Sequence, residues 1–264
     1  TLLAVKELRR LLNLLADTYE EDGKGNLLDG MASLQFGRFR RQLMEHFNQK
    51  ITTGRDRRAL LYFAGLYHDC GKVDVRQIDS NDGRVHYYNH EVYSAEKLTK
   101  RAKRLVLSNE EVKFLNLLVT HHMRFHHLVK LNDELNRRTI YRYFRDLGPA
   151  GVDLIFLSMA DTLATYGVTI TPLHWERVLS VGRQLLEAWY EFHNEVVQPP
   201  RLITGKILID TFMLEPGILI GQILSSIQEA QAVGQVNTVD EALTLAKLMI
   251  EQKVGHNETP NPNL

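Results

Sequence analysis

Histidine and aspartate are the residues of this sequence whose types and placement suit metal chemistry. They form the dipeptide His68-Asp69, the single His90, the doublet His121-His122 and Asp161. Imidazole is a borderline ligand and a carboxylate can bridge two ions, so this set suits divalent transition metals. Metal ions in such sites activate water for attack on phosphorus and neutralise the charge that develops on the phosphate oxygens. The residues therefore predict phosphoester hydrolysis, with Asp69 as the natural bridge.

The first candidates lie at the ends of stretches that are predicted to be helical. A nearly all-apolar helix over 58–67 ends at His68-Asp69, and Gly71 follows as a natural terminator. His90 stands at a helix start, after a loop or small hairpin that turns at Asn81-Asp82-Gly83. Separate helices can deliver such ligands into one cavity, as in metal sites of helical proteins.

Two further helices carry the remaining candidates. A capping box, Ser108 to Glu111, opens a helix that runs to the histidine doublet. Asp161 lies within 152–166 with Leu157 and Ala164 as its i−4 and i+3 neighbours, so we expect its carboxylate to point inward. An unpaired carboxylate there would be costly, which leaves metal binding and pairing with a buried arginine or a cap as alternatives.

Helical periodicity dominates the rest of the chain, so the sequence predicts an all-α protein. A long helix begins near Pro172, and the pair Pro199-Pro200 beyond it is the best domain boundary. We therefore expect one helical bundle over 1–198 and a smaller helical region over 199–254. The tail, 255–264, repeats Asn and Pro and is expected to be disordered.

Composition describes an ordinary globular chain. Its 264 residues, 44% of them hydrophobic, suffice for one large domain or two small ones. Lys+Arg and Asp+Glu are both 32, so any site for a polyanion must be local. No apolar run approaches the ~18 to 20 residues needed to cross a bilayer, and no signal peptide is evident, so we expect a cytoplasmic protein without membrane contact. Cys70 is the only cysteine, which excludes intramolecular disulfides and cysteine-rich zinc sites.

Several phrases of the sequence resemble one family. They are Leu-Tyr-His-Asp-Cys-Gly-Lys (66–72), Tyr-Asn-His-Glu (88–91), Val-Thr-His-His-Met-Arg (119–124) and Ala-Asp (160–161). Together they look like the HD superfamily of metal-dependent phosphohydrolases. More narrowly, and with Leu-Ile-Thr-Gly-Lys (202–206) and Glu-Pro-Gly (215–217), the chain resembles the C-terminal body of bacterial CCA-adding enzymes and poly(A) polymerases. The resemblance covers nearly the whole chain and implies an HD-domain bundle over 1–198, followed by an RNA-binding-like helical region.

The resemblance implies one or two divalent metal ions, and the ligand types do not choose among Ni, Mn, Mg, Co, Fe and Zn. The implied metal ligands are His68, Asp69, His90, His121 and Asp161. The residues assigned to catalysis are Asp69, Lys72 and His122. Lys72 would hold a phosphate oxygen as a point charge. The resemblance leaves open which member of the histidine doublet is the ligand.

The chain departs from the family pattern in two ways. The first histidine of the family stands just before a segment like Thr1-Leu2-Leu3-Ala4-Val5, so it would fall upstream of residue 1. The chain begins with Thr1 and not Met, so we expect a piece of a longer protein whose first metal is short of a ligand and weakly occupied. Nucleotidyl transfer in that family depends on a Gly-Ser element and an Asp-x-Asp pair, and neither occurs here. We do not expect this chain to add nucleotides by itself.

Three functions therefore compete. The first is a phosphohydrolase that acts on a nucleotide or RNA-end phosphoester. The second is a tRNA-binding body whose nucleotidyltransferase head is absent from this chain, and the third is a helical scaffold without a ligand. The predicted RNA-binding residues are Arg137, Arg138, Tyr141, Arg142 and Arg145, because bases stack on aromatic rings while arginines hold phosphates.

Other basic and histidine residues have weaker support. Further basic stretches lie at 38–41, 55–58 and 101–104, and most such patches are merely solvated helix faces. Four histidines have no evident partner in the sequence and are assigned surface or structural roles: His46, His86, His126 and His127. The sequence leaves the oligomeric state open.

Overall fold

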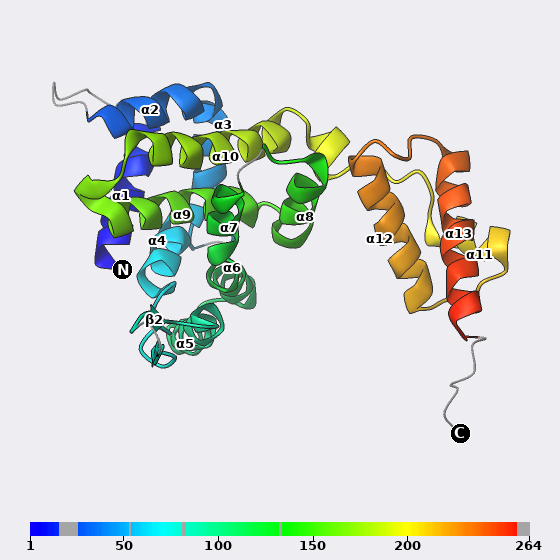
Figure 1. Cartoon of the computed structure of the whole chain (residues 1–264), viewed down its shortest axis with the longest axis horizontal. Coiled ribbons are helices and arrows are strands. Elements are labelled where there is room, and N and C mark those ends of the chain that lie inside the picture. The colour runs from blue at the N-terminus through cyan, green and yellow to red at the C-terminus, as the bar shows by residue number, and fades with distance from the viewer. Residues whose placement is uncertain (16–25, 53, 81–82, 132–133, 258–264) are drawn as a thin grey trace. The chain divides into compact units, whose positions relative to one another are not determined.

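The chain forms two compact helical units (Figure 1). A computed structural model describes residues 1–15, 26–52, 54–80, 83–131 and 134–257. The first unit comprises Thr1–Leu135 and Leu147–Tyr190, and the second comprises Asn136–Asp146 and Glu191–Leu264. Helices dominate both units, which confirms the predicted all-α class.

The first unit contains most of the helices and a two-stranded hairpin. Its elements are α1 (Leu2–Leu14), α2 (Leu27–Phe36), a 3-10 turn (Gly37–Phe39), α3 (Arg40–Asn48), α4 (Arg57–Tyr67), β1 (Gln77–Ile78), β2 (Val85–His86), α5 (His90–Arg104), α6 (Asn109–Thr120), α7 (Met123–Lys130), α9 (Ala150–Tyr166), a second 3-10 turn (Gly167–Thr169) and α10 (Pro172–Tyr190).

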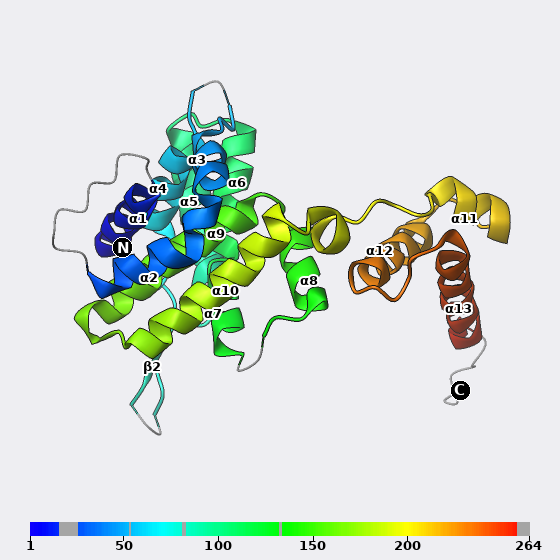
Figure 2. The ribbon, with the colours of Figure 1, turned by 90° about the horizontal axis from the view of Figure 1, so that it is seen from above.

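Helix α9 is the core of this unit. It is apolar on nearly all sides, and every residue from Ala150 to Ala160 is buried. A helix of that kind must be covered all round. The covering helices are α1, α4, α6, α7 and α10 (Figure 2). The few polar residues of α9 are therefore held in fixed surroundings.

The expected hairpin is present. β1 pairs antiparallel with β2, with Gln77 opposite His86 and Ile78 opposite Val85. Two residues of the predicted turn, 81–82, lie outside the described residues, and Gly83 after them has a φ of +70°. The hairpin leads directly to His90, which begins α5 as predicted.

The second unit has its own small core. Its elements are α8 (Arg137–Leu147, of which Leu147 belongs to the first unit), a π-helical turn (His193–Val197), α11 (Gly205–Phe212), α12 (Ile218–Ala232) and α13 (Val239–Asn257). Leu208, Ile223 and Ala242 are among the residues that fill its core. This division differs from the predicted one, because it begins at Glu191 and includes residues 136–146.

Most of the predicted disordered tail lies outside the described residues. Helix α13 continues to Asn257, so 255–257 are helical, and 258–264 lie outside the described residues. Extending an existing helix adds a hydrogen bond for each residue fixed, which offsets the poor helix propensity of Gly255.

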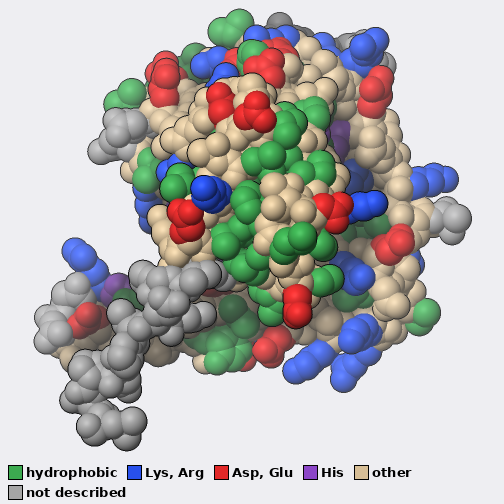
Figure 3. All heavy atoms as spheres, turned by 90° about the vertical axis from the view of Figure 1, so that its right-hand side faces the viewer, with side chains coloured by type: hydrophobic (Ala, Val, Ile, Leu, Met, Phe, Trp, Pro, Cys, Tyr) green, Lys and Arg blue, Asp and Glu red, His purple; other side chains and the backbone are tan. Residues whose placement is uncertain are grey.

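One face of the molecule mixes charged and hydrophobic side chains. The face drawn in Figure 3 shows basic and acidic side chains interspersed around a group of hydrophobic ones. In the part of the chain that the structure describes, no single helix is long and apolar enough to span a membrane. One sharply bent pair, Arg137–Leu147 with Ala150–Thr169, meets that test of length and composition only when joined.

Candidate metal centre

The His-Asp dipeptide sits on the turn that ends α4. Asp56 caps the start of this helix by accepting a hydrogen bond from the Ala59 amide at 2.8 Å. At the other end, the His68 amide still donates to the Ala64 carbonyl at 2.8 Å. The chain then turns, with the Lys72 amide donating to the Asp69 carbonyl at 3.0 Å. The dipeptide is therefore held by a helix end rather than by a free loop.

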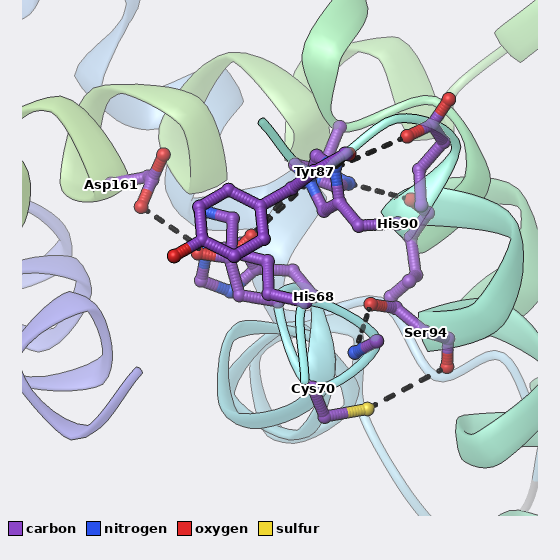
Figure 4. Close-up of polar contacts among 12 residues, drawn as sticks. His68, Cys70, Tyr87, His90, Ser94 and Asp161 are labelled. Carbon is purple, nitrogen blue, oxygen red and sulfur yellow. Dashed lines mark hydrogen bonds and ion pairs between the residues drawn. The ribbon is translucent and has the colours of Figure 1, made fainter. Parts of the chain in front are cut away.

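Gly71 fastens this turn to the start of α5. Its amide donates to the Ser94 hydroxyl at 2.8 Å. A Cβ on Gly71 would lie 2.6 Å from the Ser94 amide nitrogen and would also meet the His90 carbonyl, so no side chain fits there. Figure 4 shows Ser94 of α5 beside this turn, where its carbonyl also accepts a contact from the Cys70 thiol at 3.9 Å. The close approach sets the distance between the dipeptide and His90.

Three histidine rings are oriented by the same kind of hydrogen bond. In each, Nδ1–H donates to the backbone carbonyl three residues earlier: His68 to Gly65 at 2.8 Å, His90 to Tyr87 at 2.8 Å and His122 to Val119 at 2.7 Å. A carbonyl can only accept, so the proton of each neutral ring is on Nδ1. Each Nε2 is then left with a lone pair. Metal-binding histidines are typically oriented by a hydrogen bond of this kind.

The lone pairs of two of these rings face each other. His90 Nε2 lies 3.0 Å from His122 Nε2, and both rings are buried. Two lone pairs at that distance repel unless a proton or a cation lies between them. This arrangement fits a metal ion, for which neutral imidazole is the preferred nitrogen ligand.

Asp69 lies at the centre of the cluster. Its Oδ1 is 3.3 Å from His90 Nε2 and 3.7 Å from His122 Nε2. Its Oδ2 is 3.4 Å from His68 Nε2 and 2.7 Å from Lys72 Nζ. One carboxylate thus faces histidines on both sides, as a bridging ligand must.

Asp161 completes the cluster from α9. Its Oδ1 is 3.1 Å from His68 Nε2, and its Oδ2 is 3.2 Å from His126 Nε2. Figure 4 shows Asp161 and His68 pointing at each other from α9 and from the end of α4. Two sets of ligand atoms lie within 4.8 Å of one another: Asp69, His90 and His122, and His68, Asp69 and Asp161. Asp69 belongs to both sets.

The protonation of the cluster follows from burial and from the two carboxylates. Burial lowers the pKa of His68, but hydrogen bonds to Asp161 and Asp69 outweigh it and raise the pKa to about 9. Burial lowers the pKa of His122 to about 3, and the neighbouring His68 contributes to the same shift. A hydrogen bond to Asp69 raises the pKa of His90.

Both carboxylates are held ionised. Burial raises the pKa of Asp69, but hydrogen bonds from His68 and His90 lower it well below its usual range. Burial likewise opposes ionisation of Asp161, and hydrogen bonds from His126 and His68 lower its pKa. Metal ligands must be deprotonated, so these carboxylates are ready to bind a cation.

A pocket of about 250 Å³ opens on Asp69 and Asp161. Lys72 and Lys130 contribute positive charge to its walls. Its other lining residues include the aromatic pair Tyr166 and His174, with ring centroids 5.0 Å apart, and the apolar Met123, Val129 and Val178. The pocket thus combines cations, aromatic rings and apolar surface next to the cluster.

The structure brings together most of the residues singled out in the sequence. His68, Asp69, His90, Asp161 and Lys72 are in contact with one another, directly or through one partner. Of the doublet, His122 joins the cluster. His121, the predicted ligand, follows the last residue of α6 and belongs to neither set of ligand atoms among the described residues.

Sequence reasoning missed two histidine contacts. His126 lies one helical turn after His122 and faces Asp161. That i,i+4 spacing was the signal that could have found it. His46 Nε2 lies 2.9 Å from Asp153 Oδ2, in a second buried cluster with Arg57. The sequence around His46 does not indicate its partner, Asp153, which lies 107 residues away.

The predicted RNA-binding residues of α8 already have partners. Arg138 and Arg142 lie 3.2 Å and 2.7 Å from Glu229 of α12, and Arg145 lies 3.6 Å from it and 2.7 Å from Asp146. Arg137 lies 4.0 Å from Glu195, and Tyr141 is buried. A phosphate would have to displace Glu229 to reach these arginines, so RNA binding by this group stays a prediction.

Comparison with known proteins identifies relatives of this arrangement. A family model described as "HD domain" matches residues 33–165, half of the chain. The A-adding tRNA nucleotidyltransferase of Deinococcus radiodurans is 31% identical over 235 residues, which cover 87% of this chain and 51% of that protein. The CC-adding tRNA nucleotidyltransferase of Thermus thermophilus is 32% identical over 188 residues, 68% of this chain and 37% of that protein. The chain spans about half the length, or less, of the curated relatives that it matches.

Proposed function

The chain belongs to the HD domain family, and from that premise we propose that its His/Asp cluster binds one or two divalent metal ions and hydrolyses a phosphoester of a nucleotide or an RNA end. The observation that carries the proposal is the pair of facing Nε2 atoms of His90 and His122, 3.0 Å apart, beside the ionised Asp69. A proton or a cation must lie between these two nitrogens, and the ionised Asp69 beside both rings favours a cation.

The residues of this chain would divide the work as follows. His68 and Asp161 would hold one ion, His90 and His122 a second, and Asp69 would be shared. Metal ions at these positions would supply activation of water and neutralise charge on the phosphate oxygens. Metals that bind both imidazole nitrogen and carboxylate oxygen fit this set of ligands best.

The pocket would position the substrate. Lys72 Nζ is 2.7 Å from Asp69 Oδ2 and partly exposed, so it can turn towards a phosphate oxygen next to the cluster. Lys130 provides a second cation, and the Tyr166–His174 pair offers a surface on which a base can stack. These features favour a nucleotide over a small inorganic phosphate ester.

The test compares metal content and phosphatase activity in the wild-type chain, Asp69→Asn and His127→Gln. The substrates are p-nitrophenyl phosphate and a nucleoside 2′,3′-cyclic phosphate, each with and without added Mn²⁺, Ni²⁺ or Mg²⁺. Asp69→Asn should lose metal and at least about 10³-fold in activity, since metal stabilisation of the transition state contributes several kcal/mol. His127 is exposed and lies outside the cluster, so its variant should behave as wild type.

The histidine doublet offers a sharper version of the same experiment. His122→Gln should lose metal together with activity, whereas His121→Gln should keep both. The same assay is run on a chain extended upstream by ~10 residues. If neither chain shows metal-stimulated activity, the proposed hydrolase function is rejected.

A second candidate is a tRNA-binding body, and we propose that this chain by itself adds no nucleotides. The relatives above are tRNA nucleotidyltransferases by name, and the sequence lacks both Gly-Ser and Asp-x-Asp. Binding of tRNA by the Asp69→Asn variant, with an affinity that falls linearly with salt on logarithmic axes, would support this role separately from hydrolysis.

A further inference from the structure

Five cations at one corner of the first unit have no acidic partner. Lys100, Arg101, Lys103 and Arg104 lie in the last two turns of α5, and Lys113 lies on the adjacent α6. All five are exposed, and none forms an ion pair with a described carboxylate. We call these five residues the α5–α6 corner. Lys97, one turn earlier on α5, is by contrast paired with Asp74.

The basic residues of the last turn of α5 have an ordinary structural role, since cations stabilise a helix C-terminus. That role does not extend to Lys113, which is on a different helix. The acidic residues nearest in sequence are Glu96, Glu110 and Glu111, and Glu111 is already bound by Arg55 at 2.9 Å. The positive charge of the corner is therefore largely uncompensated.

A groove separates the two helices at this corner. It has a volume of about 420 Å³, and Lys103 and Lys113 both line it. Asn109 and Asn116 add side-chain amides, and the Asn116 amide donates to the Thr99 hydroxyl at 3.1 Å. Ammonium, amide and hydroxyl groups in one concave surface suit phosphate and ribose oxygens.

Val106, in the loop between the helices, has a strained backbone, which independently indicates a functional role for this corner. Its φ is +57°, a conformation that is strained for a β-branched residue. The Leu107 amide donates to the Ala102 carbonyl at 3.0 Å, so Val106 occupies the place in a helix-ending motif where glycine is usual. Its side chain is 86% exposed, so no packing in this unit compensates the strain.

These observations favour RNA over a membrane. The cations line the two sides of a groove, and only Leu105 and Val106 offer exposed apolar surface at the loop. That is too little apolar area for membrane insertion, which requires a broad apolar face. It is enough for contact with one ribose or base beside the bound phosphates.

The α5–α6 corner also differs from the basic face of α8. There, Arg138 and Arg142 are held by Glu229, so a polyanion must first break those ion pairs. No such competitor exists among the described residues at the corner. We propose that the α5–α6 corner is an RNA-binding surface that holds the phosphate backbone across the groove and packs Val106 against the nucleotide.

This surface is separate from the metal centre. Helix α5 begins at the metal-site residue His90 and ends at the corner, 14 residues later, a distance of about 21 Å along the helix. RNA binding at the corner is therefore independent of hydrolysis at the metal centre. The corner provides a surface that the second candidate function requires.

The test measures fluorescence anisotropy of a fluorescein-labelled RNA hairpin with the whole chain, between 50 and 300 mM KCl. The double variant Lys103→Glu/Lys113→Glu should lose at least about tenfold in affinity at 100 mM KCl, and the slope of log affinity against log salt should fall by about 2. The matched control, Lys6→Glu/Arg9→Glu, makes the same change in net charge on exposed residues of α1 and should bind nearly as wild type.

Val106→Gly separates binding from stability. Glycine relieves the strain, so the midpoint of urea unfolding should rise while RNA affinity falls about threefold. Equal affinity of the double variant and wild type would overturn the inference. So would equal losses in the double variant and its control, or binding to phosphatidylserine vesicles without binding to the RNA. Metal-stimulated hydrolysis of p-nitrophenyl phosphate by the double variant reports on the metal centre independently.

Discussion

Two His/Asp clusters lie at opposite ends of the same pair of helices. Helix α4 carries Arg57 in its first turn and reaches His68 at its end, while α9 carries Asp153 and Asp161. The two aspartates are eight residues apart, about 12 Å along the helix. One pairs with Arg57 and the other with His68.

The first cluster is closed. Asp153 is fully buried and lies 2.6 Å from Arg57 Nη2 and 2.9 Å from His46 Nε2. Arg57 also stacks over the Phe114 ring at 4.8 Å. The carboxylate has its countercharge, so the cluster needs no further cation.

The second cluster is open. Asp69 and Asp161 face histidine nitrogens, and the nearest permanent cation, Lys72, is partly exposed. The cluster also faces a pocket, whereas Asp153 has no exposed surface. The difference shows that a buried His–Asp contact does not by itself indicate a metal site. What distinguishes the two clusters is whether the carboxylate already has a fixed positive partner.

The largest effect should come from neutralising the closed cluster. Asp153→Asn leaves the Arg57 charge buried without its partner, which should lower the free energy of unfolding by about 3–5 kcal/mol. Asp69→Asn, measured in EDTA, should lower it less, because Asp69 and its partner Lys72 both reach solvent. Urea unfolding of the two variants provides the measurement. Equal destabilisation would mean that the two clusters serve the same structural purpose.

A smaller effect is expected from His126, which contacts only the open cluster. His126→Ala removes the hydrogen bond to Asp161 Oδ2 without removing an expected ligand. Loss of such an orienting partner typically weakens metal binding 10- to 100-fold. Competition with a chromophoric chelator measures the change. His126→Asn, which keeps a donor, should recover part of the affinity, and a variant with unchanged affinity would remove His126 from the site.

The smallest effect is the pH dependence. With the pKa of His68 raised to about 9, a proton on Nε2 competes with metal, so affinity should rise by up to about tenfold per pH unit towards pH 9. In the metal-free protein the same pKa shift makes the folding stability fall, and not rise, as the pH increases. The folded state holds more protons than the unfolded state, so the stabilisation from His68 is complete below pH 6.5 and is lost as the pH rises through 9.

Calorimetry in two buffers of different ionisation enthalpy checks the prediction. Metal binding at pH 7.5 should release about one proton from His68. Binding that releases none, with an affinity that is flat from pH 7 to 9, would show that metal does not displace this proton.

Local sequence patterns predicted the open cluster better than the closed one. His68, His90 and Asp161 could be placed because each lies at a predicted helix end or on an apolar helix face. The choice between His121 and His122 could not be made, because both follow the last turn of α6 and the direction of each ring depends on the geometry of that turn. Sequence patterns describe local structure, and the pairing of His46 with Asp153 arises only from tertiary packing.

The same limit explains two features of the second unit that local sequence patterns do not reveal. The arginines of α8 formed a convincing basic stretch, but Glu229 lies far along the chain and neutralises three of them. The division of the chain at Glu191 rather than near Pro199 likewise depends on which helices pack together.

The hydrogen bonds that tie three histidine rings to the backbone carbonyls three residues earlier have an entropic consequence. His68, His90 and His122 cannot rotate freely before a ligand arrives, because each Nδ1 is already anchored. Binding would therefore freeze few additional side-chain rotations. The selectivity of the centre would then be governed by how well an ion fits a nearly rigid cage, since little flexibility is left to adapt to a poor fit.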